Sequence, residues 1–316
     1  MNRRWTEADL ADQTGRTVLV TGANSGLGLR TAEVLAGRGA RVLLACRSPE
    51  RGAAALSRVS SVAAGPVPEL VTLDLADLAS VRKAVITVRE LTGDALDVLV
   101  NNAGVMATAK ATTADGHDLQ FGTNHLGHAA LTWLLMPALR GGAAARVVTV
   151  SSLAAIGARI RFDDPNFERR SYNPGAAYAQ SKLANQVFAL ELDRRLRAAD
   201  SPVISVAAHP GYTTTGLVPN MARSYHNPVL RKVIRGTARL GDLLIAQDVA
   251  HGALPQLYAA TEPGVSGGDY YGPDRLFNAR GHPTKVRTLA AAHNAATGSA
   301  LWELTAGLTN VTPDPQ

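Results

Sequence analysis

Several features are scarce in this 316-residue sequence, and each scarcity excludes a class of protein. Cys46 is the only cysteine, so no internal disulfide can form, and a reducing, cytoplasmic compartment is predicted. The longest apolar run, around residues 129–139, contains a proline and is much shorter than the roughly 20 residues that span a bilayer. Residues 1–12 are polar and lack the apolar core of a signal peptide. We therefore expect no membrane span.

Aromatic residues contribute only 5% of the sequence, so the core is expected to consist of Val, Leu, Ile and Ala. The hydrophobic fraction of 46% is nevertheless that of a globular protein and excludes a disordered or low-complexity chain. The net charge is +6, but the basic residues are scattered and do not alternate with aromatics, so nucleic acid is not an expected partner. The sequence also lacks a His, Cys, Asp and Glu pattern with the spacing of a zinc site, and no metal is predicted.

Apolar strand patterns alternate with helical ones over the first two thirds of the chain. Strands are predicted at 17–21, 41–46, 69–73, 95–101, 146–151 and 203–208, and helices at 29–38, 50–62, 80–91, 119–139 and 178–199. This alternation predicts an α/β fold, a single Rossmann-type doubly wound parallel sheet flanked by helices on both faces.

No segment has the composition of a linker, so residues 1–316 are interpreted as one dinucleotide-binding and catalytic domain. Two insertions near 157–177 and 214–241 interrupt the alternation and are candidate walls of a substrate pocket, because such sheets bind ligands beyond their strand ends. The tail, residues 312–316, is expected to be disordered.

A glycine-rich turn, TGANSGLG at residues 21–28, joins the first strand to the first helix. Glycines allow a tight turn and a close approach of the backbone to a pyrophosphate, and the helix N-terminus adds free N–H groups. Glycine also marks ordinary turns, but the strand before and the helix after this turn favour dinucleotide binding.

The end of the second strand indicates which dinucleotide binds. NAD-binding folds usually carry an acidic residue about 20 residues beyond the glycines, on the ribose 2′-hydroxyl. No acidic residue occurs here between Gly39 and Pro49, and the sequence instead has Arg47 and Ser48. A guanidinium can form a forked pair with a 2′-phosphate, so NADP(H) is favoured over NAD(H). A surface arginine of no special role is the alternative.

Tyr178 and Lys182 stand four residues apart in a predicted helix and share one face. A nearby ammonium stabilises a phenolate and lowers the phenol pKa, which makes the pair a plausible acid and base for a carbonyl or an alcohol. Taken alone, such a pair is usually part of a solvated helix face.

The pair is accompanied by NNAG at 101–104, Asn124, the serines 151 and 152, and HPG at 209–211. In this order, the motifs resemble the short-chain dehydrogenase/reductase family over roughly residues 15–275. The segments TGANSGLG, LACRSPERG, NNAGVM and YAQSKLAN are similar to its retinol-dehydrogenase-like branch. The insertion between Ser152 and Tyr178, at residues 159–177, also resembles one typical of that branch.

The resemblance implies a catalytic set of Asn124, Ser152, Tyr178 and Lys182. Tyr178 would be the acid/base, Lys182 would lower its pKa and bind the nicotinamide ribose, and Ser152 would hold the substrate oxygen. Asn124 would anchor a water that relays protons, and Ser151 would be structural. The implied cofactor contacts are Gly22, Asn24, Ser25, Gly26, Leu27, Arg47, Ser48, Asp74, Leu75, Asn101, Ala103, Gly104, Tyr178, Lys182, Pro210, Gly211, Thr213 and Thr215.

The leading hypothesis is therefore an NADP(H)-dependent oxidoreductase, a carbonyl reductase or alcohol dehydrogenase that transfers a hydride between nicotinamide and a small-molecule substrate. The apolar residues of the second insertion favour a lipophilic carbonyl or alcohol. A non-catalytic NADP(H)-binding sensor or scaffold is the alternative, and the complete set of four candidate catalytic residues speaks against it. By the same resemblance, the predicted helices that contain residues 119 and 178 suggest a homodimer or homotetramer.

Overall fold

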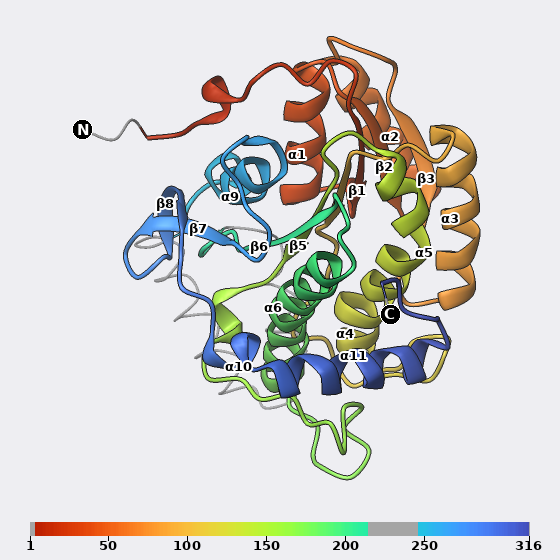
Figure 1. Ribbon diagram of the computed structural model, residues 1–316, viewed down its shortest axis with the longest axis vertical. Helices are drawn as coiled ribbons and strands as arrows, with labels where there is room; N and C mark the ends of the chain where they lie inside the picture. Colours follow the sequence, from red (N-terminus) through yellow and green to blue (C-terminus); the bar gives the residue numbers. More distant parts are fainter. Residues whose placement is uncertain (1–3, 214–245, 316) are drawn as a thin grey trace.

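The computed structural model describes residues 4–213 and 246–315. One sheet of eight strands runs through these residues in the order β3-β2-β1-β4-β5-β6-β7-β8 (Figure 1). The strands are β1 (Thr17–Thr21), β2 (Arg41–Cys46), β3 (Glu69–Thr72), β4 (Val98–Asn101), β5 (Arg146–Val150), β6 (Ile204–Ala208), β7 (Tyr270–Arg275) and β8 (Arg280–Lys285).

The six predicted strands pair in parallel, as expected, and so does β7, which was not predicted, whereas β8 is antiparallel to β7. The reason is the connection between them: only residues 276–279 separate β7 from β8, and so short a hairpin can join only antiparallel strands. The sheet is therefore mostly parallel, with one antiparallel edge strand that the sequence analysis did not predict.

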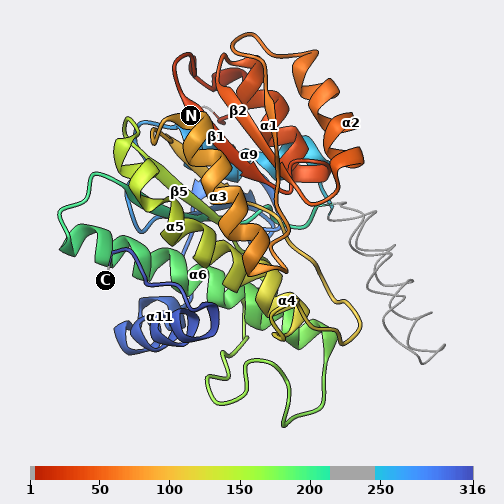
Figure 2. The same ribbon diagram turned by 90° about the vertical axis from the view of Figure 1, so that its right-hand side faces the viewer.

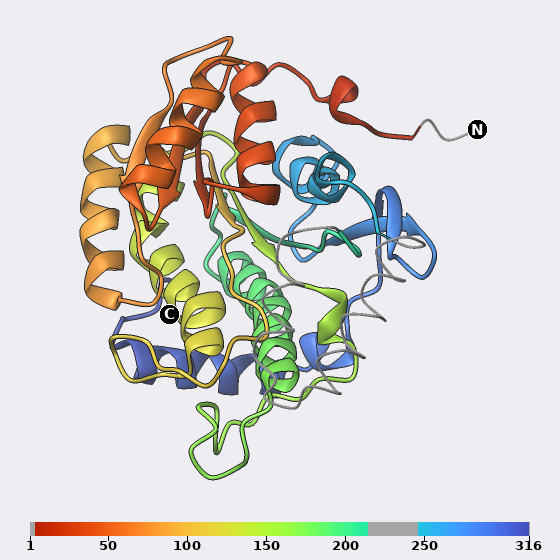
Figure 3. The ribbon, with the colours of Figure 1, turned by 180° about the vertical axis from the view of Figure 1, so that it is seen from behind.

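Helices cover both faces of the sheet. They are α1 (Gly26–Gly37), α2 (Pro49–Ser60), α3 (Leu78–Thr92), α4 (Leu119–Phe121), α5 (Gly127–Gly141), α6 (Pro174–Ala198), α9 (Val249–Thr261), α10 (Ala290–His293) and α11 (Ala295–Thr309), with short 3₁₀ turns η1 (Glu7–Asp9) and η3 (Leu153–Ala155). Figures 1 and 3 show α3 and α9 on opposite sides of the sheet, and Figure 2 shows α11 alongside α6. Within the described part of the chain, no helix combines the length and apolarity needed to cross a membrane.

Two hydrophobic cores result, one on each face. In β1, Val18 and Val20 pack with α1, α2 and α9, whereas Leu19 packs with α3, α5, α6 and α11. Because successive side chains of a strand point to opposite faces, an almost continuous apolar strand supplies both cores. This arrangement confirms the predicted fold class.

Aliphatic residues and alanine form most of both cores, as expected, but three large aromatic side chains pack together where α5, α6 and α11 meet. Trp302 of α11 lies with its ring centroid 4.8 Å from that of Trp133 and 5.7 Å from that of Phe188. These three rings join α5, α6 and α11, so the last helix is held on the sheet by aromatic packing that the composition did not suggest.

The predicted helix at 119–139 is interrupted. A π-helical turn, η2 (Gly122–Leu126), separates α4 from α5 and contains Asn124. Such wide turns often occur at functional sites. The predicted helix at 178–199 begins earlier, at Pro174, because the Asn173 side chain caps it by accepting a hydrogen bond from the Ala176 N–H, and proline suits the first helical position.

The first insertion is packed against the fold. Phe167 is 1% exposed, Gln180 donates to the Pro165 carbonyl at 2.9 Å, and Asn166 accepts from the Asp118 N–H at 3.0 Å. It therefore connects the start of α6 to the loop before α4. The second insertion, 214–241, and the predicted cofactor contact Thr215 lie outside the described residues.

The tail at 312–315 is ordered, contrary to the prediction. The Asp314 carboxylate accepts a 2.8 Å hydrogen bond from the Arg140 guanidinium at the end of α5, and Pro315 is buried. A charge-assisted pair and buried proline contacts compensate the entropy that a free end would keep.

Candidate active site

A cavity of about 750 Å³ lies at the carboxyl ends of four neighbouring parallel strands, β3, β2, β1 and β4. Its walls come from the segments that follow β1, β2, β3 and β4, which is where doubly wound sheets bind ligands. Many of the predicted cofactor contacts line it, namely Gly22, Asn24, Ser25, Gly26, Leu27, Arg47, Asp74, Leu75, Ala103 and Gly104.

The glycine turn packs closely on the segment after β4. Gly22 has φ +66°, and a side-chain carbon there would lie 2.9 Å from the Ala103 Cα. A side-chain carbon on Gly28 would lie 2.4 Å from the Asn102 Nδ2 and 2.5 Å from the Gly22 carbonyl oxygen. Both positions therefore require glycine. The Ser25 side chain makes no capping hydrogen bond at the start of α1, so N–H groups of the first turn stay available to an anion.

Two arginines line the cavity beyond the end of β2. The Arg47 side chain is 60% exposed, and its Nε lies 4.0 Å from the Asp74 carboxylate, which is too long for a strong pair. Arg51, in the first turn of α2, lines the same cavity. The sequence analysis did not identify Arg51, although it stands four residues after Arg47 and belongs to the quoted segment LACRSPERG.

Two predicted contacts have side chains that are engaged elsewhere. The Ser48 hydroxyl caps α2, accepting from the Arg51 N–H at 3.3 Å and donating to the Glu50 carboxylate at 2.7 Å. The Asn101 side chain has no exposed surface and donates to the Thr132 hydroxyl at 2.9 Å inside the protein. As the last residue of β4, Asn101 faces the α5 side of the sheet.

Asn102 lies at the cavity instead. Its N–H donates to the Thr21 hydroxyl at 2.9 Å, and its Nδ2 donates to the Thr21 carbonyl at 2.8 Å. These bonds hold the end of β4 against the glycine turn after β1. The sequence pattern NNAG contains both asparagines and does not distinguish their directions.

Ser152 and Tyr178 meet at the end of β5. Ser152 follows that strand and accepts from the Ala154 N–H at 3.1 Å, and its side chain is hydrogen-bonded to the Tyr178 hydroxyl. Burial raises the pKa of Tyr178, and the hydrogen bond from Ser152 lowers it only in part. The expected lowering by Lys182 is not the dominant influence on this pKa, because the Lys182 Nζ lies 6.0 Å from the phenol ring centroid.

Lys182 is buried, with 4% of its surface exposed, and burial lowers its pKa to about 8. Its Nζ donates to the Val150 carbonyl at 2.9 Å, and it has no second acceptor among the described residues. The same Nζ lies 3.5 Å from the position that a side chain on Gly104 would take, and Gly104 lines the cavity. Two of its three protons are thus free for a ligand. Ser151 donates to the Lys182 carbonyl at 2.7 Å, which is the structural role expected of it.

Asn124 is fully buried in the π-helical turn. Its Oδ1 accepts from the Val105 N–H at 2.8 Å, and its Nδ2 donates to the Val105 carbonyl and the Ser181 hydroxyl, each at 2.9 Å. These bonds connect the segment after β4 with α6. The remaining lone pair of Oδ1 is the part of the side chain left for the predicted water relay.

The wall of the cavity that follows β4, around residues 105–109, depends on Ala107 and Gln120, which the sequence analysis did not identify. Ala107 has φ +47°, an unusual conformation for a residue with a side chain, and its N–H donates to the buried Gln120 at 2.7 Å. Gln120 in turn donates to the Tyr172 hydroxyl at 2.8 Å, and that hydroxyl donates to the Thr108 carbonyl at 3.1 Å. The first insertion therefore braces this wall. A single glutamine in a helix carries no signal that would have revealed its role.

The segment after β6 reaches the glycine turn from the other side. Gly211 has φ +67°, and a side chain there would lie 2.4 Å from the Ala279 carbonyl. Thr213 donates to the Pro210 carbonyl at 2.9 Å. A side-chain carbon on Gly252 would lie 2.4 Å from the Thr213 hydroxyl and 3.0 Å from Leu27, so these residues form one packed group.

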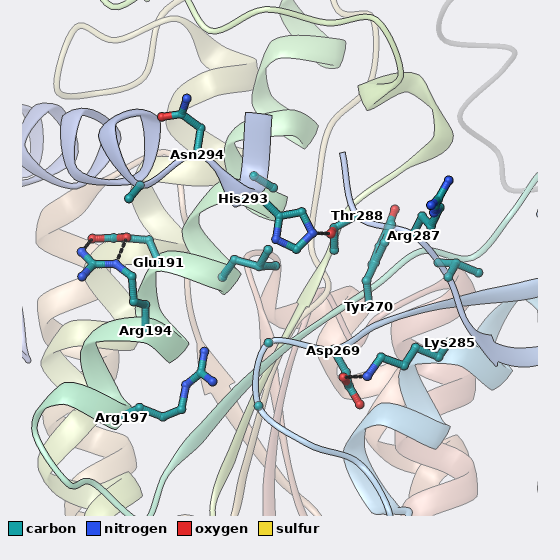
Figure 4. Close-up of a pocket in the computed structure, with 16 residues that line it drawn as sticks. Glu191, Arg194, Arg197, Asp269, Tyr270, Lys285, Arg287, Thr288, His293 and Asn294 are labelled. Carbon is teal, nitrogen blue, oxygen red and sulfur yellow. Dashed lines mark hydrogen bonds and ion pairs between the residues drawn. The ribbon is translucent and has the colours of Figure 1, made fainter. Parts of the chain in front are cut away.

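A second cavity, of about 640 Å³, lies away from these residues, between α6, the start of β7 and the segment after β8 (Figure 4). Its charged groups are largely paired with one another. Glu191 accepts from Arg194 at 2.6 Å and from Arg195 at 2.7 Å, and Asp269 pairs with Lys285. Among the described residues, none of the predicted site residues lines it.

The fold and the site define a class, and comparison with known proteins identifies it. The model of the family described as short chain dehydrogenase matches residues 16–225, so the chain belongs to this family of oxidoreductases. Human retinol dehydrogenase 14 is 41% identical over 273 residues, which are 82% of this chain and 78% of that protein. The chain therefore lies in the retinol-dehydrogenase-like branch, as predicted.

Two further relatives are informative. Human retinol dehydrogenase 13 is 45% identical over 203 residues, covering 64% of this chain and 60% of the length of that protein. The crystal structure of an uncharacterized protein from Mycobacterium paratuberculosis is 41% identical and covers 99% of this chain and 100% of that one, with a TM-score of 0.81.

Proposed function

We propose that this protein is an NADP(H)-dependent oxidoreductase, formed by one catalytic domain, that interconverts a carbonyl compound and an alcohol. The observation that supports the proposal most is that Ser152 is hydrogen-bonded to Tyr178, with the Lys182 Nζ 6.0 Å from the phenol ring centroid. The same Nζ faces Gly104, which lines a cavity whose walls also include the glycine turn and two arginines. A hydroxyl pair, a buried amine and an anion-binding helix end are the groups that this chemistry needs.

The residues present fit a nicotinamide dinucleotide. The free N–H groups at the start of α1 suit its pyrophosphate. Position 28 has no space for a side chain, and the glycine there leaves the backbone of this turn open to the phosphates. Arg47 and Arg51 suit a 2′-phosphate, whereas the segment after β2 offers no acidic residue for an unmodified ribose. The two free protons of Lys182 suit the hydroxyls of the second ribose. When bound, the nicotinamide supplies or accepts the hydride.

The protein's own residues then handle the proton. Ser152 orients the substrate oxygen, and Tyr178 donates its proton to that oxygen as negative charge develops on it. The raised pKa of Tyr178 keeps the phenol protonated at neutral pH, which suits reduction. With a pKa of about 8, Lys182 is mostly charged at pH 7 and stabilises the phenolate left behind. A water at Asn124 would return the proton.

The substrate is proposed to be lipophilic. Val105, Met106 and Ala109 give the wall that follows β4 an apolar character, and the related human proteins bear the name retinol dehydrogenase. A cytoplasmic location and a homodimer or homotetramer stay predictions of the sequence.

The test compares the wild type with Tyr178→Phe on a panel of lipophilic aldehydes, ketones and alcohols. The absorbance of NADPH measures the turnover. The wild type should consume NADPH with at least one carbonyl compound. The variant should lose about 10²–10⁴-fold in kcat, the range for a general acid, and keep its calorimetric affinity for NADPH. Wild-type activity in Tyr178→Phe would contradict the role. Tight NADPH binding by a wild type that turns over nothing in the panel would favour the sensor or scaffold.

A further inference from the structure

His128 is a buried residue near the start of α5 to which no motif assigns a role. It is 1% exposed, and each of its ring nitrogens has a polar partner. Nδ1 lies 2.9 Å from the Asn124 carbonyl oxygen, and Nε2 lies 2.9 Å from the Thr21 hydroxyl. Its two partners belong to opposite ends of the site, since Thr21 precedes the glycine turn and Asn124 is a candidate catalytic residue.

The partners determine where the protons lie. Burial and the nearby Lys182 ammonium lower the pKa of His128 to about 4, so the ring is neutral and carries one N–H. A carbonyl oxygen can only accept, which places that proton on Nδ1. Nε2 is then an acceptor and receives the proton of the Thr21 hydroxyl.

The Thr21 hydroxyl continues this chain into the cavity wall. Its oxygen accepts the N–H groups of Asn102 at 2.9 Å and Ala103 at 3.0 Å, and both residues line the cavity. A competing acceptor for its proton, the Val100 carbonyl, is farther away at 3.2 Å. With His128 in place, the hydroxyl therefore has a defined direction, and both N–H groups face its lone pairs.

At the other end, His128 binds the backbone of the π-helical turn. That turn carries the Asn124 side chain, whose bonds to Val105 and Ser181 join the segment after β4 to α6. A shift of the Asn124 backbone would displace all of these bonds together.

We propose that His128 is a positioning residue that couples the nucleotide end of the site, through Thr21, to the catalytic end, through Asn124. The inference rests on the proposed function, because it assigns His128 a role in the same site. The alternative is that His128 only contributes to packing. The neighbouring His125 serves as a control that distinguishes a positioning role from a packing role. His125 is equally buried, but its Nε2 bonds the Thr305 hydroxyl of α11 at 2.8 Å, on the side of the aromatic cluster.

The experiment uses four variants of the full chain. His128→Leu removes both bonds and should raise KM for NADPH and lower kcat, each about tenfold, the effect of one lost buried hydrogen bond. His128→Asn keeps a donor near the Nδ1 position and should affect mainly KM for NADPH. His128→Gln keeps an acceptor that can reach Thr21 and should affect mainly kcat. His125→Leu should lower the melting temperature as His128→Leu does and leave both kinetic constants unchanged.

The proposal would be overturned if His128→Leu had the kinetic constants of the wild type. It would also be overturned if the Asn, Gln and His125 variants all changed KM and kcat in the same way. If His128→Leu does not fold, the other two variants decide the question, because His128→Asn should change mainly KM for NADPH and His128→Gln mainly kcat. Failure of the proposed function is a different result, because it would appear in the wild type itself, as no turnover of any compound in the panel, and it would remove both proposals.

Discussion

The two cavities of this protein differ in how their polar groups are partnered. In the cavity between α6 and β7, each buried carboxylate has its own cation: Glu191 bonds Arg194 and Arg195, and Asp269 pairs with Lys285. Beside the cavity at the strand ends, behind Gly104, the Lys182 ammonium has one acceptor among the described residues. Arg47 there has only a long contact with Asp74.

This difference is more informative than the number of charges in each cavity. Folding normally satisfies buried polar groups, so a buried amine with free protons costs stability unless a ligand completes its bonds. Paired charges at the edge of the sheet need no ligand. The cavity with incompletely paired charges is accordingly the one to which we assign the proposed chemistry.

The sharpest way to test this contrast is Lys182→Met, which should abolish function and increase stability. We expect kcat to fall by about 10²-fold or more, since the phenolate loses its neighbouring ammonium. The free energy of unfolding at pH 7 should rise by about 1–3 kcal/mol, because a buried charge is removed. The Val150 carbonyl stays satisfied through Asn185, which donates to it at 3.1 Å.

The pH dependence gives this prediction a second readout. The pKa of Lys182 is lowered from 10.5 to about 8 in the folded protein, so the unfolded chain binds more protons between these values. The wild type should therefore gain stability as the pH rises from 8 to 10.5, and the advantage of Lys182→Met should disappear over the same interval. Urea unfolding at pH 7 and pH 10 measures both. A less stable variant at pH 7 would show that the amine is already fully paired.

A smaller effect is expected for Arg47→Asp, which reverses the charge at the nucleotide end. Losing one charge-assisted hydrogen bond and gaining a repelling carboxylate should shift the ratio of NADPH to NADH affinity by about 10–100-fold toward NADH. Calorimetric titration with both nucleotides measures the ratio. Ser48→Ala is the matched control, because its hydroxyl caps α2 and its loss should change stability and not the ratio. A wild type that already prefers NADH would refute the interpretation of Arg47.

The smallest effect is expected in the paired cavity. In Arg194→Ala, Glu191 keeps the 2.7 Å bond to Arg195, so the free energy of unfolding should change by less than about 0.5 kcal/mol. Since none of the described site residues lines this cavity, kcat/KM should equal the wild-type value. A clear loss of kcat/KM would mean that the two cavities are coupled and that the contrast drawn between them is wrong.

Much of the fold was predictable because local patterns determine it. The strands at 17–21 and 41–46 were predicted with their observed ends. A short run of β-branched and aliphatic residues between turn residues is typical of a buried strand in an α/β protein. The glycines of the first turn were predictable for the same reason: Gly22 has a positive φ, and Gly28 has no space for a side chain. Ser152, Tyr178 and Lys182 were selected as candidates from their order along the chain, and their roles stay predictions.

Other features were not predictable from local patterns. The edge strand β8, the aromatic packing of α11 and the anchored tail depend on contacts between residues far apart in the sequence. The same holds for the direction of Asn101 and for Gln120, whose role exists only because Tyr172 and Ala107 lie against it.

By itself, the sequence determined the order of strands and helices, the glycine turn and the identity of the groups that can carry the chemistry, because these depend on residue type and on spacing along the chain. Only the tertiary structure decided which of those groups are left with free bonding capacity. Burial raises the pKa of Tyr178 and lowers that of Lys182, and His128 binds two ends of the site that are 103 residues apart in the sequence. Solvent exclusion and hydrogen-bond partners are properties of the packed molecule, so they cannot be predicted from residues that are neighbours in the sequence.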